Sequence, residues 1–483
     1  MKRYIFSAML TLAAAWLAMG PTAAQAEQYL IVARGNSFSD AFDGAVKGAG
    51  GTVDRKLAAI GVAVARSDDP DFLAKAAAIA GVQAVVPDLA IPIEDDTDTG
   101  AAPPAGTGSP WGSDRPDLTS FQWAPQAIHA DEARAIGFTG KGVRVVVMDG
   151  SIMTNHPNLV DNLNVELSKS FVPEEGIEFV PGGVSGNFSH ATHVAGIIAA
   201  ADMGFGTIGV APQAELVLAK VGRDADQTIR PSAAIAALVY AADIQADVVN
   251  MSWVVYLWKM QASWLRDLVA SPEWDSTAIM TACQRAANYA HDHGVTLVAG
   301  AGNGGWDFDH MSCLFAIPRD LPHVICISAT GPVGWARNPA TDLDLPAFYT
   351  DYGQSMIDLA APGGGGDPWN DWGNLTLGGI TLPCFVFDMV LSTSSRFAAP
   401  FGGLPEDPYE PGGTWTWASG TSMAAPHVAG VAALVIEANG GAITPDQVRT
   451  ILQRSADDIG KSGNDDFYGL GRVNALKAVT LLR

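Results

Sequence analysis

The chain has 483 residues, a formal net charge of −23 and a hydrophobic content of 48%. This length exceeds that of one ordinary domain, so we expect a main domain with accessory pieces, and the apolar content is ample for a large core. The acidic balance argues against a partner nucleic acid and against an anionic membrane surface, because both are bound through clustered Lys and Arg side chains.

The first residues have the pattern of an export signal. Lys2 and Arg3 precede an apolar stretch at 4–19, and residues 24–26 read Ala-Gln-Ala. A charged start, an apolar core and an A-x-A site are typical of a secretory signal peptide, so we predict removal of residues 1–26. A retained anchor is the alternative, but the apolar core is shorter than the ~20 residues of a spanning helix. We therefore expect a secreted or periplasmic protein that does not contact the membrane after signal removal.

Residues 27–93 combine short strand and helix patterns. We predict them in this order: strand 29–34, helix 38–47, strands within 53–66, helix 69–80 and strand 82–86. The order is that of a small β-α-β-β-α-β domain. The next segment, 94–122, opens with a run of Asp, Gly, Pro and Ala that contains almost nothing to pack. We predict an exposed linker there, in which a maturation cleavage falls at a bond that the sequence does not reveal.

From residue 123 to residue 483, strand and helix patterns alternate. We predict strands ending at Met148 and at 215–221, 247–251, 295–299 and 324–329, and helices after His190, at 231–244, at 282–291 and after Ser422. Short β-branched runs bounded by glycine are typical of buried parallel strands. We predict an α/β fold with a doubly wound, mostly parallel sheet and helices on both faces, whose sites lie at the carboxyl ends of the strands.

A serine near the C-terminus stands at the start of a predicted helix. Residues 420–430 read Gly-Thr-Ser-Met-Ala-Ala-Pro-His-Val-Ala-Gly, so that Ser422 lies between a glycine and a small-residue apolar run. A helix N-terminus leaves backbone N–H groups unpaired and carries partial positive charge, so an oxyanion formed beside Ser422 meets ready donors. Ser422 is therefore a candidate nucleophile, provided that a base and an orienting acid lie nearby.

Three further polar residues lie at the ends of predicted strands or at the start of a predicted helix. Asp149 ends a buried strand, His190 begins a second helix of small apolar residues, and Asn303 lies in a glycine-rich loop after a strand. Alone, each has an ordinary interpretation, because Asp and Asn often form turns and a histidine is often packed in a core. We interpret His193 and His427, on the same two helices, as such structural histidines. The four residues together, in chain order and in context, predict a nucleophilic site.

These four segments resemble the motifs of the subtilisin family of serine peptidases. They share the chain order Asp, His, Ser of that family, which differs from the order in chymotrypsin and in the α/β-hydrolases. Further segments at 209–212, 250–252 and 359–363 match the family as well. The resemblance covers nearly all of the chain from residue 123 onward.

The resemblance implies a role for each residue. Asp149 orients and stabilises the imidazole, His190 acts as general base and then as general acid, and Ser422 is the nucleophile. Asn303 is the side-chain donor of the oxyanion hole. The chain is then a serine endopeptidase that hydrolyses polypeptide substrates through an acyl-enzyme intermediate.

Residues 27–93 resemble the inhibitory propeptide of the same family. The resemblance implies a zymogen that processes itself and a propeptide that acts as an intramolecular inhibitor before it is cut away. A permanent N-terminal domain with another role is the alternative. We expect the peptidase to be a monomer that requires no cofactor.

Two other functions compete with this interpretation. An α/β-hydrolase esterase needs the chain order Ser, Asp, His and a G-x-S-x-G elbow, but residues 420–424 lack the final glycine. A pseudopeptidase that keeps the fold as a binding module usually lacks a member of the triad, and none is missing here.

The expected substrate groove departs from the family's pattern. By the resemblance, it is lined by Ser252, Trp253, Val254, Gly300 and Gly302. Where the family usually continues Leu-Gly-Gly after the serine, this chain has Trp-Val-Val. These larger side chains either crowd the pocket or face inward as core residues. Substrate preference therefore cannot be carried over from the family.

The metal ligands of the family are also altered. Residues 201–208 align with a loop that binds structural calcium in many members, but Met203 stands where an amide oxygen would ligate and Asn158 where a carboxylate would. A thioether is a poor ligand for a hard cation. We expect this calcium site to be empty, leave structural calcium elsewhere open, and expect no metal in the active site.

The four cysteines, Cys283, Cys313, Cys326 and Cys384, all fall in the large domain. In an oxidising compartment they permit three pairings for two disulfides, and their spacing, which has no CxxC pair, does not predict a zinc site. Buried thiols are the alternative.

Two segments, 253–283 and 364–388, make the chain longer than a compact family member, and both contain Trp. The aromatic stripe of the first segment is interpreted as core, with a lid or substrate subsite as the alternative.

Overall fold

The computed structural model describes residues 27–93, 98–99, 116–180, 188–259, 275–311, 313–365, 373–395 and 414–481. The predicted signal peptide at 1–26, most of the predicted linker and the centres of the two Trp-containing segments lie outside these residues. The chain divides into two compact units, namely Met1–Leu89 with Trp258–Ala282, and Ala90–Leu257 with Cys283–Arg483.

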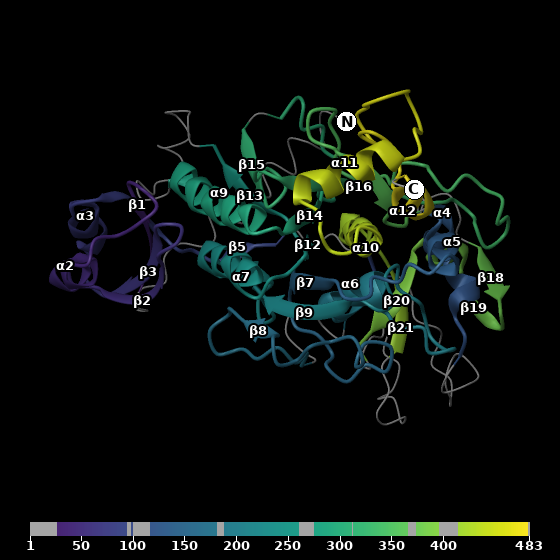
Figure 1. Ribbon diagram of the computed structural model, residues 1–483, viewed down its shortest axis with the longest axis horizontal. Helices are drawn as coiled ribbons and strands as arrows, with labels where there is room; N and C mark the ends of the chain where they lie inside the picture. Colours follow the sequence, from purple (N-terminus) through teal and green to yellow (C-terminus); the bar gives the residue numbers. More distant parts are fainter. Residues whose placement is uncertain are drawn as a thin grey trace. The chain divides into compact units, whose positions relative to one another are not determined.

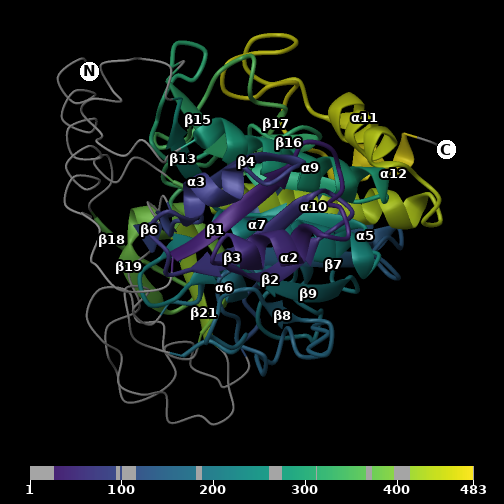
Figure 2. The same cartoon turned by 90° about the vertical axis from the view of Figure 1, so that its left-hand side faces the viewer.

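The first unit contains a four-stranded antiparallel sheet with two helices. Its elements are β1 (Glu27–Ala33), α2 (Phe42–Gly48), β2 (Thr52–Leu57), β3 (Val62–Ser67), α3 (Phe72–Ala77) and β4 (Val82–Pro87). The strand order is β2-β3-β1-β4, and both helices lie on one face of the sheet (Figures 1 and 2). Phe42, Val46 and Phe72 of the helices pack against Tyr29 and Ile31 of β1. The predicted β-α-β-β-α-β order is confirmed.

Both of these helices are shorter than predicted. α3 begins at Phe72 rather than at residue 69, because a side-chain oxygen of Asp69 accepts a hydrogen bond from the N–H of Asp71 at 2.9 Å and holds a turn there. α2 begins at Phe42 rather than at residue 38. A periodic pattern alone does not reveal where such local side-chain bonds replace the first helical turn.

The second unit is built on a seven-stranded sheet. Its strands are β7 (Arg144–Asp149), β8 (Lys169–Ser170), β9 (Glu215–Lys220), β12 (Val248–Met251), β14 (Thr296–Gly300), β16 (Val324–Thr330) and β17 (Leu359–Pro362). They lie in the order β17-β16-β14-β12-β7-β9-β8, and every pair is parallel (Figure 1). Almost every residue of these strands is buried, which explains their continuous apolar runs. The predicted doubly wound α/β fold is confirmed.

The strand order reverses its direction between β7 and β12. On one side of β7 the chain first forms β8 at the edge of the sheet and then β9 between β8 and β7, and it adds β12, β14, β16 and β17 on the other side. In open α/β sheets, sites form outside the carboxyl ends of the strands at such a switch point. This place is therefore where a functional site is expected in this fold.

Helices flank the sheet: α4 (Trp123–Ala127), α5 (Ala130–Ala135), α6 (His190–Ala199), α7 (Pro231–Asp243), α9 (Ser276–Asp292), α10 (Thr421–Ala438), α11 (Pro445–Ser455) and α12 (Ala475–Thr480). α6 and α10 pack against each other and against the central strands (Figure 1). Glycines let other segments pack closely on each of these helices, since a Cβ on Gly196 of α6 would lie 2.0 Å from Thr393 Oγ1 and one on Gly430 of α10 would lie 2.6 Å from Val210 Cβ. α9 begins at Ser276 rather than at 282, because Asp275 accepts hydrogen bonds from two N–H groups of its first turn.

Smaller sheets surround this core, and the sequence pattern did not predict them. β20 (Val390–Ser394), β21 (Thr414–Ser419) and β6 (Asp98–Thr99) form one, and β10 (Gly222–Arg223), β11 (Thr228–Ile229) and β5 (Ile91–Pro92) form another. Two-stranded sheets join β13 (Val255–Trp258) with β15 (Leu314–Ile317), and β18 (Asn374–Leu377) with β19 (Ile380–Pro383). Such short pairs depend on contacts between distant segments.

Within the described residues, α10 is the one helix that is long and apolar enough to cross a membrane, with a mean hydropathy of 1.3 over 18 residues. In the fold, 89% of this window is buried. A helix that is apolar on all sides is expected when it is surrounded by protein. α10 is therefore the central core helix of the second unit.

Candidate active site

Asp149 and His190 form a hydrogen-bonded pair at the carboxyl end of β7. Asp149 is the last residue of β7, and both of its carboxylate oxygens lie 2.9 Å from His190 Nδ1. The N-cap residue of α6, Ser189, donates to the carbonyl of Ser151 at 2.8 Å and ties the start of the helix to the loop after β7. Because a carboxylate oxygen accepts hydrogen bonds, the imidazole donates to it through Nδ1 in this pair.

Ser422 lies in the first turn of α10 and bonds to the end of β12. Its hydroxyl donates to the carbonyl oxygen of Ser252 at 3.0 Å, and the hydroxyl of Ser252 donates to the carbonyl oxygen of Ser422 at 2.8 Å. The second bond has a local reason. Pro426 stands four residues further along the helix and has no N–H to give to the Ser422 carbonyl, so Ser252 replaces that donor.

The indole of Trp253 joins the ends of the two central strands. Its N–H donates to the carbonyl oxygen of Met148, the residue before Asp149, at 2.9 Å. Trp253 and Val254 are only 5% and 4% exposed. Of the two alternatives for these side chains, the structure supports the inward-facing core position.

Asn303 is held beside the same helix start. Its side-chain oxygen accepts from the N–H of Thr421 at 2.8 Å and from the Thr421 hydroxyl at 2.9 Å, while that hydroxyl accepts from the N–H of Gly302 at 3.1 Å. A Cβ on Gly300 would lie 3.0 Å from the Thr421 carbonyl oxygen. Because the amide oxygen faces Thr421, the amide NH₂ group is turned away from it. The structure thus brings Asn303, Gly300 and Gly302 to the N-terminus of α10.

A buried ion pair, which the sequence analysis missed, supports the loop that carries Asn303. Arg319 and Asp351 are fully buried, with Nη1 and Oδ2 3.0 Å apart, and Arg319 also donates to the carbonyl oxygen of Ala301. Asp351 accepts from the N–H of Trp306 at 2.9 Å and from the hydroxyl of Tyr256 at 2.8 Å. Burial raises the pKa of Asp351 above its ordinary value, while the charge of Arg319 acts against that shift. No motif marks these residues, because they lie far apart along the chain.

Gly302 fits this arrangement only as glycine. Its φ is 112°, a conformation that side chains disfavour, and a Cβ there would lie 2.4 Å from Asp351 Oδ2 and 2.6 Å from the Tyr256 hydroxyl. The Asp351 carboxylate and Tyr256 therefore pack directly against the loop backbone.

His193 and His427 are buried and hydrogen-bonded to backbone carbonyls. His193 Nε2 lies 3.1 Å from the Thr416 carbonyl oxygen, and His427 Nδ1 lies 2.8 Å from that of Met423. Burial lowers the pKa of His193 to about 3 and that of His427 to about 4. Both imidazoles are thus neutral near pH 7. This agrees with the interpretation of both residues as structural histidines.

In the loop at 201–208, Asn158 bonds to the carbonyl groups that face it. Its side-chain NH₂ donates to the carbonyl oxygens of Ala201 at 3.2 Å and of Phe205 at 3.1 Å, and its side-chain oxygen accepts from the Trp415 indole at 2.9 Å. The Met203 side chain is 42% exposed, so its thioether is not a buried ligand of the loop. The Asn158 amide therefore donates to two carbonyl oxygens, of Ala201 and Phe205, that would otherwise be available to a cation.

None of the four described cysteines forms a disulfide in the structure. Cys283, Cys326 and Cys384 are buried, and Cys313 is partly exposed. Burial raises the pKa of the Cys326 thiol well above its ordinary value. Cys283, Cys326 and Cys384 thus match the alternative of buried thiols, whereas Cys313 is partly exposed.

The buried ion pair leads to a stability prediction. Asp351→Asn removes the buried partner of Arg319 and leaves it with Asp320 alone, a partly exposed carboxylate whose Oδ1 lies 3.5 Å from Nε, so we expect it to lower the free energy of unfolding by about 3 kcal/mol. Tyr256→Phe removes one hydrogen bond to the same carboxylate and is the matched control, with an expected loss of about 1–2 kcal/mol. Urea unfolding in a Ser422→Ala background, which excludes self-digestion, measures both. Equal losses would contradict this role of the ion pair.

The two buried histidines predict a loss of stability in acid. Their pKa values are about 3 and about 4 in the folded chain and ~6.5 when unfolded, so below pH ~6.5 the unfolded state binds more protons. The free energy of unfolding is therefore unaffected by these two histidines above pH ~6.5. At pH 5 it is lower by about 2 kcal/mol for each of them. We expect His427→Gln, measured by urea unfolding at pH 8 and pH 5 in the same background, to show a smaller pH dependence. An unchanged dependence would contradict this assignment.

Comparison with known proteins gives the family. A family model described as the subtilase family, peptidase S8, matches residues 140–471. Subtilisin BL and Subtilisin Savinase of Lederbergia lenta are each 30% identical over 357 residues, which cover 74% of this chain and 97% of each relative.

Solved structures agree with this match. A lanthipeptide protease is 26% identical, with a TM-score of 0.56, and the alignment covers 75% of this chain and 94% of that protein. The epidermin leader peptide processing serine protease (EpiP) of Staphylococcus aureus shares the fold, with a TM-score of 0.70 at 20% identity over 95% of this chain and 99% of EpiP. The chain belongs to the subtilase family and is a subtilisin-like serine peptidase.

Proposed function

We propose that Asp149, His190 and Ser422 are the catalytic triad of this endopeptidase. The observation that carries the proposal is the bond of His190 Nδ1 to both oxygens of the buried Asp149, at 2.9 Å each, with His190 on a helix that packs against α10, whose first turn carries Ser422. Asp149 fixes the tautomer in which Nε2 is a base. His190 then takes the hydroxyl proton of Ser422 as the oxygen attacks a peptide carbonyl, and it returns that proton to the leaving amine.

The attack requires an exchange of hydrogen bonds at Ser422. A hydroxyl has a single proton, which Ser422 gives to the carbonyl oxygen of Ser252. Rotation of the side chain toward His190 breaks that bond and forms the one through which the proton is transferred. Apo enzymes often hold their catalytic hydrogen bonds in such relaxed arrangements and tighten them only with substrate bound.

The oxyanion that forms in this step is held by two donors. These are the side-chain NH₂ group of Asn303 and the backbone N–H of Ser422 at the N-terminus of α10, where helical N–H groups have no intrahelical partner. Two bonds from Thr421 to the amide oxygen of Asn303 support this role, because they fix the orientation of the amide before substrate arrives. Water then hydrolyses the acyl-enzyme with His190 as the base.

We further infer that the protein is exported to the cell exterior or the periplasm as a zymogen that processes itself. The N-terminal pattern of residues 1–26 and the α+β unit that follows support this inference. The first linker residues that the structure describes also support it. Asp98 of β6 pairs with Ser419 of β21, the strand that ends three residues before Ser422. These two linker residues thus pair with the strand that leads to the proposed nucleophile, which supports cleavage within the linker.

A fluorophosphonate probe tests the triad. We expect the wild-type protein to be labelled at Ser422, whereas Ser422→Ala is not labelled and Ser462→Ala, a change at an exposed serine, is labelled normally. Asn303→Ala should keep slow labelling and lose kcat, since loss of the corresponding donor in subtilisin costs about 10²–10³-fold.

The same proteins report on maturation, because wild type should lose residues up to the linker at 94–122 while Ser422→Ala keeps them. Labelling of Ser422→Ala, or no labelling of the folded wild type, would contradict the proposed triad. Normal labelling without any N-terminal shortening would contradict self-processing alone.

We propose that the loop at 201–208 binds no calcium. The two hydrogen bonds from Asn158 to its carbonyl oxygens support this, because a donor stands where calcium would need another oxygen. We expect any effect of added calcium on the Tm of the protein, once stripped of metals with EDTA, to be the same in wild type and in Asn158→Ala. A rise in Tm on addition of calcium that is lost in Asn158→Ala would contradict the proposal.

A further inference from the structure

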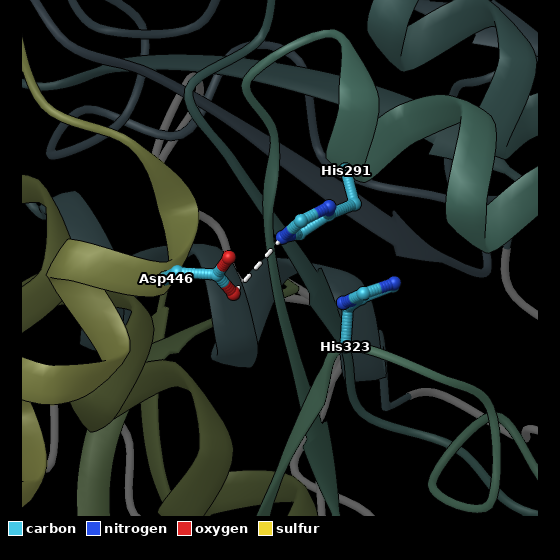
Figure 3. Close-up of side chains that lie close together, drawn as sticks. All are labelled: His291, His323 and Asp446. Atoms are coloured by element: carbon cyan, nitrogen blue, oxygen red, sulfur yellow. Dashed lines mark hydrogen bonds and ion pairs between the residues drawn. The ribbon is translucent and has the colours of Figure 1, made fainter.

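Two histidines and an aspartate from three separate segments meet on the surface of the second unit. They are His291, His323 and Asp446, and one ligand atom from each lies within 4.8 Å of the others. Figure 3 shows the two imidazole rings one above the other, each with a nitrogen on the side that faces the Asp446 carboxylate. None of these residues belongs to the proposed catalytic site.

The contacts within this cluster are close. His291 Nε2 lies 3.1 Å from Asp446 Oδ1. The rings of His291 and His323 are stacked, with centroids 3.7 Å apart and planes inclined by 13° (Figure 3). His291 Nδ1 is buried and has no hydrogen-bond partner among the described residues, and its nearest carboxylate oxygen is Asp292 Oδ1 at 3.6 Å.

Each member is held by a rigid element. His291 lies in the last turn of α9, and His323 directly precedes β16 with a φ of 66°. Asp446 lies in the first turn of α11, where Thr444 and Gln447 form a capping box. The backbone positions of all three are therefore determined by regular structure rather than by a free loop.

The charges around the cluster favour a cation. Asp446 and Asp292 both face His291. The positive group near His323, Arg449, is itself paired with the carboxylate of Asp358. The cluster is thus surrounded by the two carboxylates of Asp446 and Asp292, while the charge of Arg449 is neutralised by Asp358.

We propose that His291, His323 and Asp446 bind one zinc ion. Two imidazole nitrogens and one carboxylate oxygen are donors that zinc prefers, at bond lengths of about 2.0–2.2 Å, and they leave a fourth position for water. Zinc takes the place of the proton between His291 Nε2 and Asp446, and the imidazole then carries its single proton on Nδ1, which it reaches by exchange with solvent. Asp292 accepts from that Nδ1–H, as carboxylates next to zinc-bound histidines do.

The ligand atoms must approach one another to reach tetrahedral geometry, and the structure permits this. The stacked rings have to turn about their Cβ–Cγ bonds so that both nitrogens point at one ion. Asp446 and His323 are exposed, the former with 74% of its side chain accessible, so neither movement displaces packed core. His291 is 14% exposed and acts as the fixed member.

The position of the cluster indicates a structural role. His323 precedes β16, and α9 ends just before β14, so the cluster lies at the amino ends of these two parallel strands. Asn303 follows the carboxyl end of β14, and five residues of strand span roughly 16 Å. The ion therefore joins α9, β16 and α11 without taking part in peptide hydrolysis.

Zinc titration of the metal-stripped, untagged full-length protein tests the proposal, with Ser422→Ala present to exclude self-digestion. We expect one zinc per chain by calorimetry, a rise in Tm, and ligand-field absorption when Co²⁺ is used as a spectroscopic substitute. Asp446→Asn, His291→Ala and His323→Ala should each weaken binding by at least about 100-fold, more than loss of an outer carboxylate typically costs.

The matched control is His293→Ala, since this exposed histidine lies two residues from His291 and its Nδ1 is 2.7 Å from the Tyr289 carbonyl oxygen. Its affinity for zinc should be unchanged. Asp446→Asn alters only an exposed side chain, so its result does not depend on refolding of a core. Absence of saturable binding, binding that survives all three ligand variants, or equal weakening by His293→Ala would each overturn the proposal.

Discussion

The parallel pairing of β7 with β12 is the constraint on which the site depends. Its register places Val147 beside Asn250, so that Asp149 and Ser252 emerge at the same edge of the sheet, where the strand order reverses. The Trp253 indole bonds to the end of β7, and Ser252 bonds twice to Ser422. Because these bonds connect both strand ends with the start of α10, the proposed acid, base and nucleophile share one rigid frame.

Buried polar side chains also hold the loops around this frame through hydrogen bonds to backbone groups. Around the loop of Asn303, a buried Arg319–Asp351 pair supplies hydrogen bonds to the backbone of Ala301 and Trp306, and Tyr256 donates to the same Asp351 carboxylate. In the loop at 201–208, the amide of Asn158 provides donors where a cation would provide charge. Both solutions follow the same rule, since a buried oxygen or N–H group is costly unless it has a partner. Trp253 and Val254, the larger residues after Ser252, are buried in the same interior.

Much of the fold and of the candidate site could be predicted from the chain. Runs such as the one ending at Asp149 indicated buried parallel strands, and the small-residue helices after His190 and Ser422 were recognisable because close packing requires such residues. The ends of helices were less predictable, as α3 and α9 show, because single side-chain bonds set them. The supporting residues Arg319 and Asp351 left no local pattern, since their partner groups are distant in sequence.

The sequence by itself determined the family, the doubly wound fold and the identities of the four proposed site residues, because spacing, periodicity and motif order are local properties. Only the tertiary structure decided which way Trp253 points, which carbonyl groups Asn158 bonds to, and that His291, His323 and Asp446 come together. Each of these is a contact between segments separated by tens to hundreds of residues. Such contacts arise when whole helices and strands pack together, and no local sequence pattern predicts them.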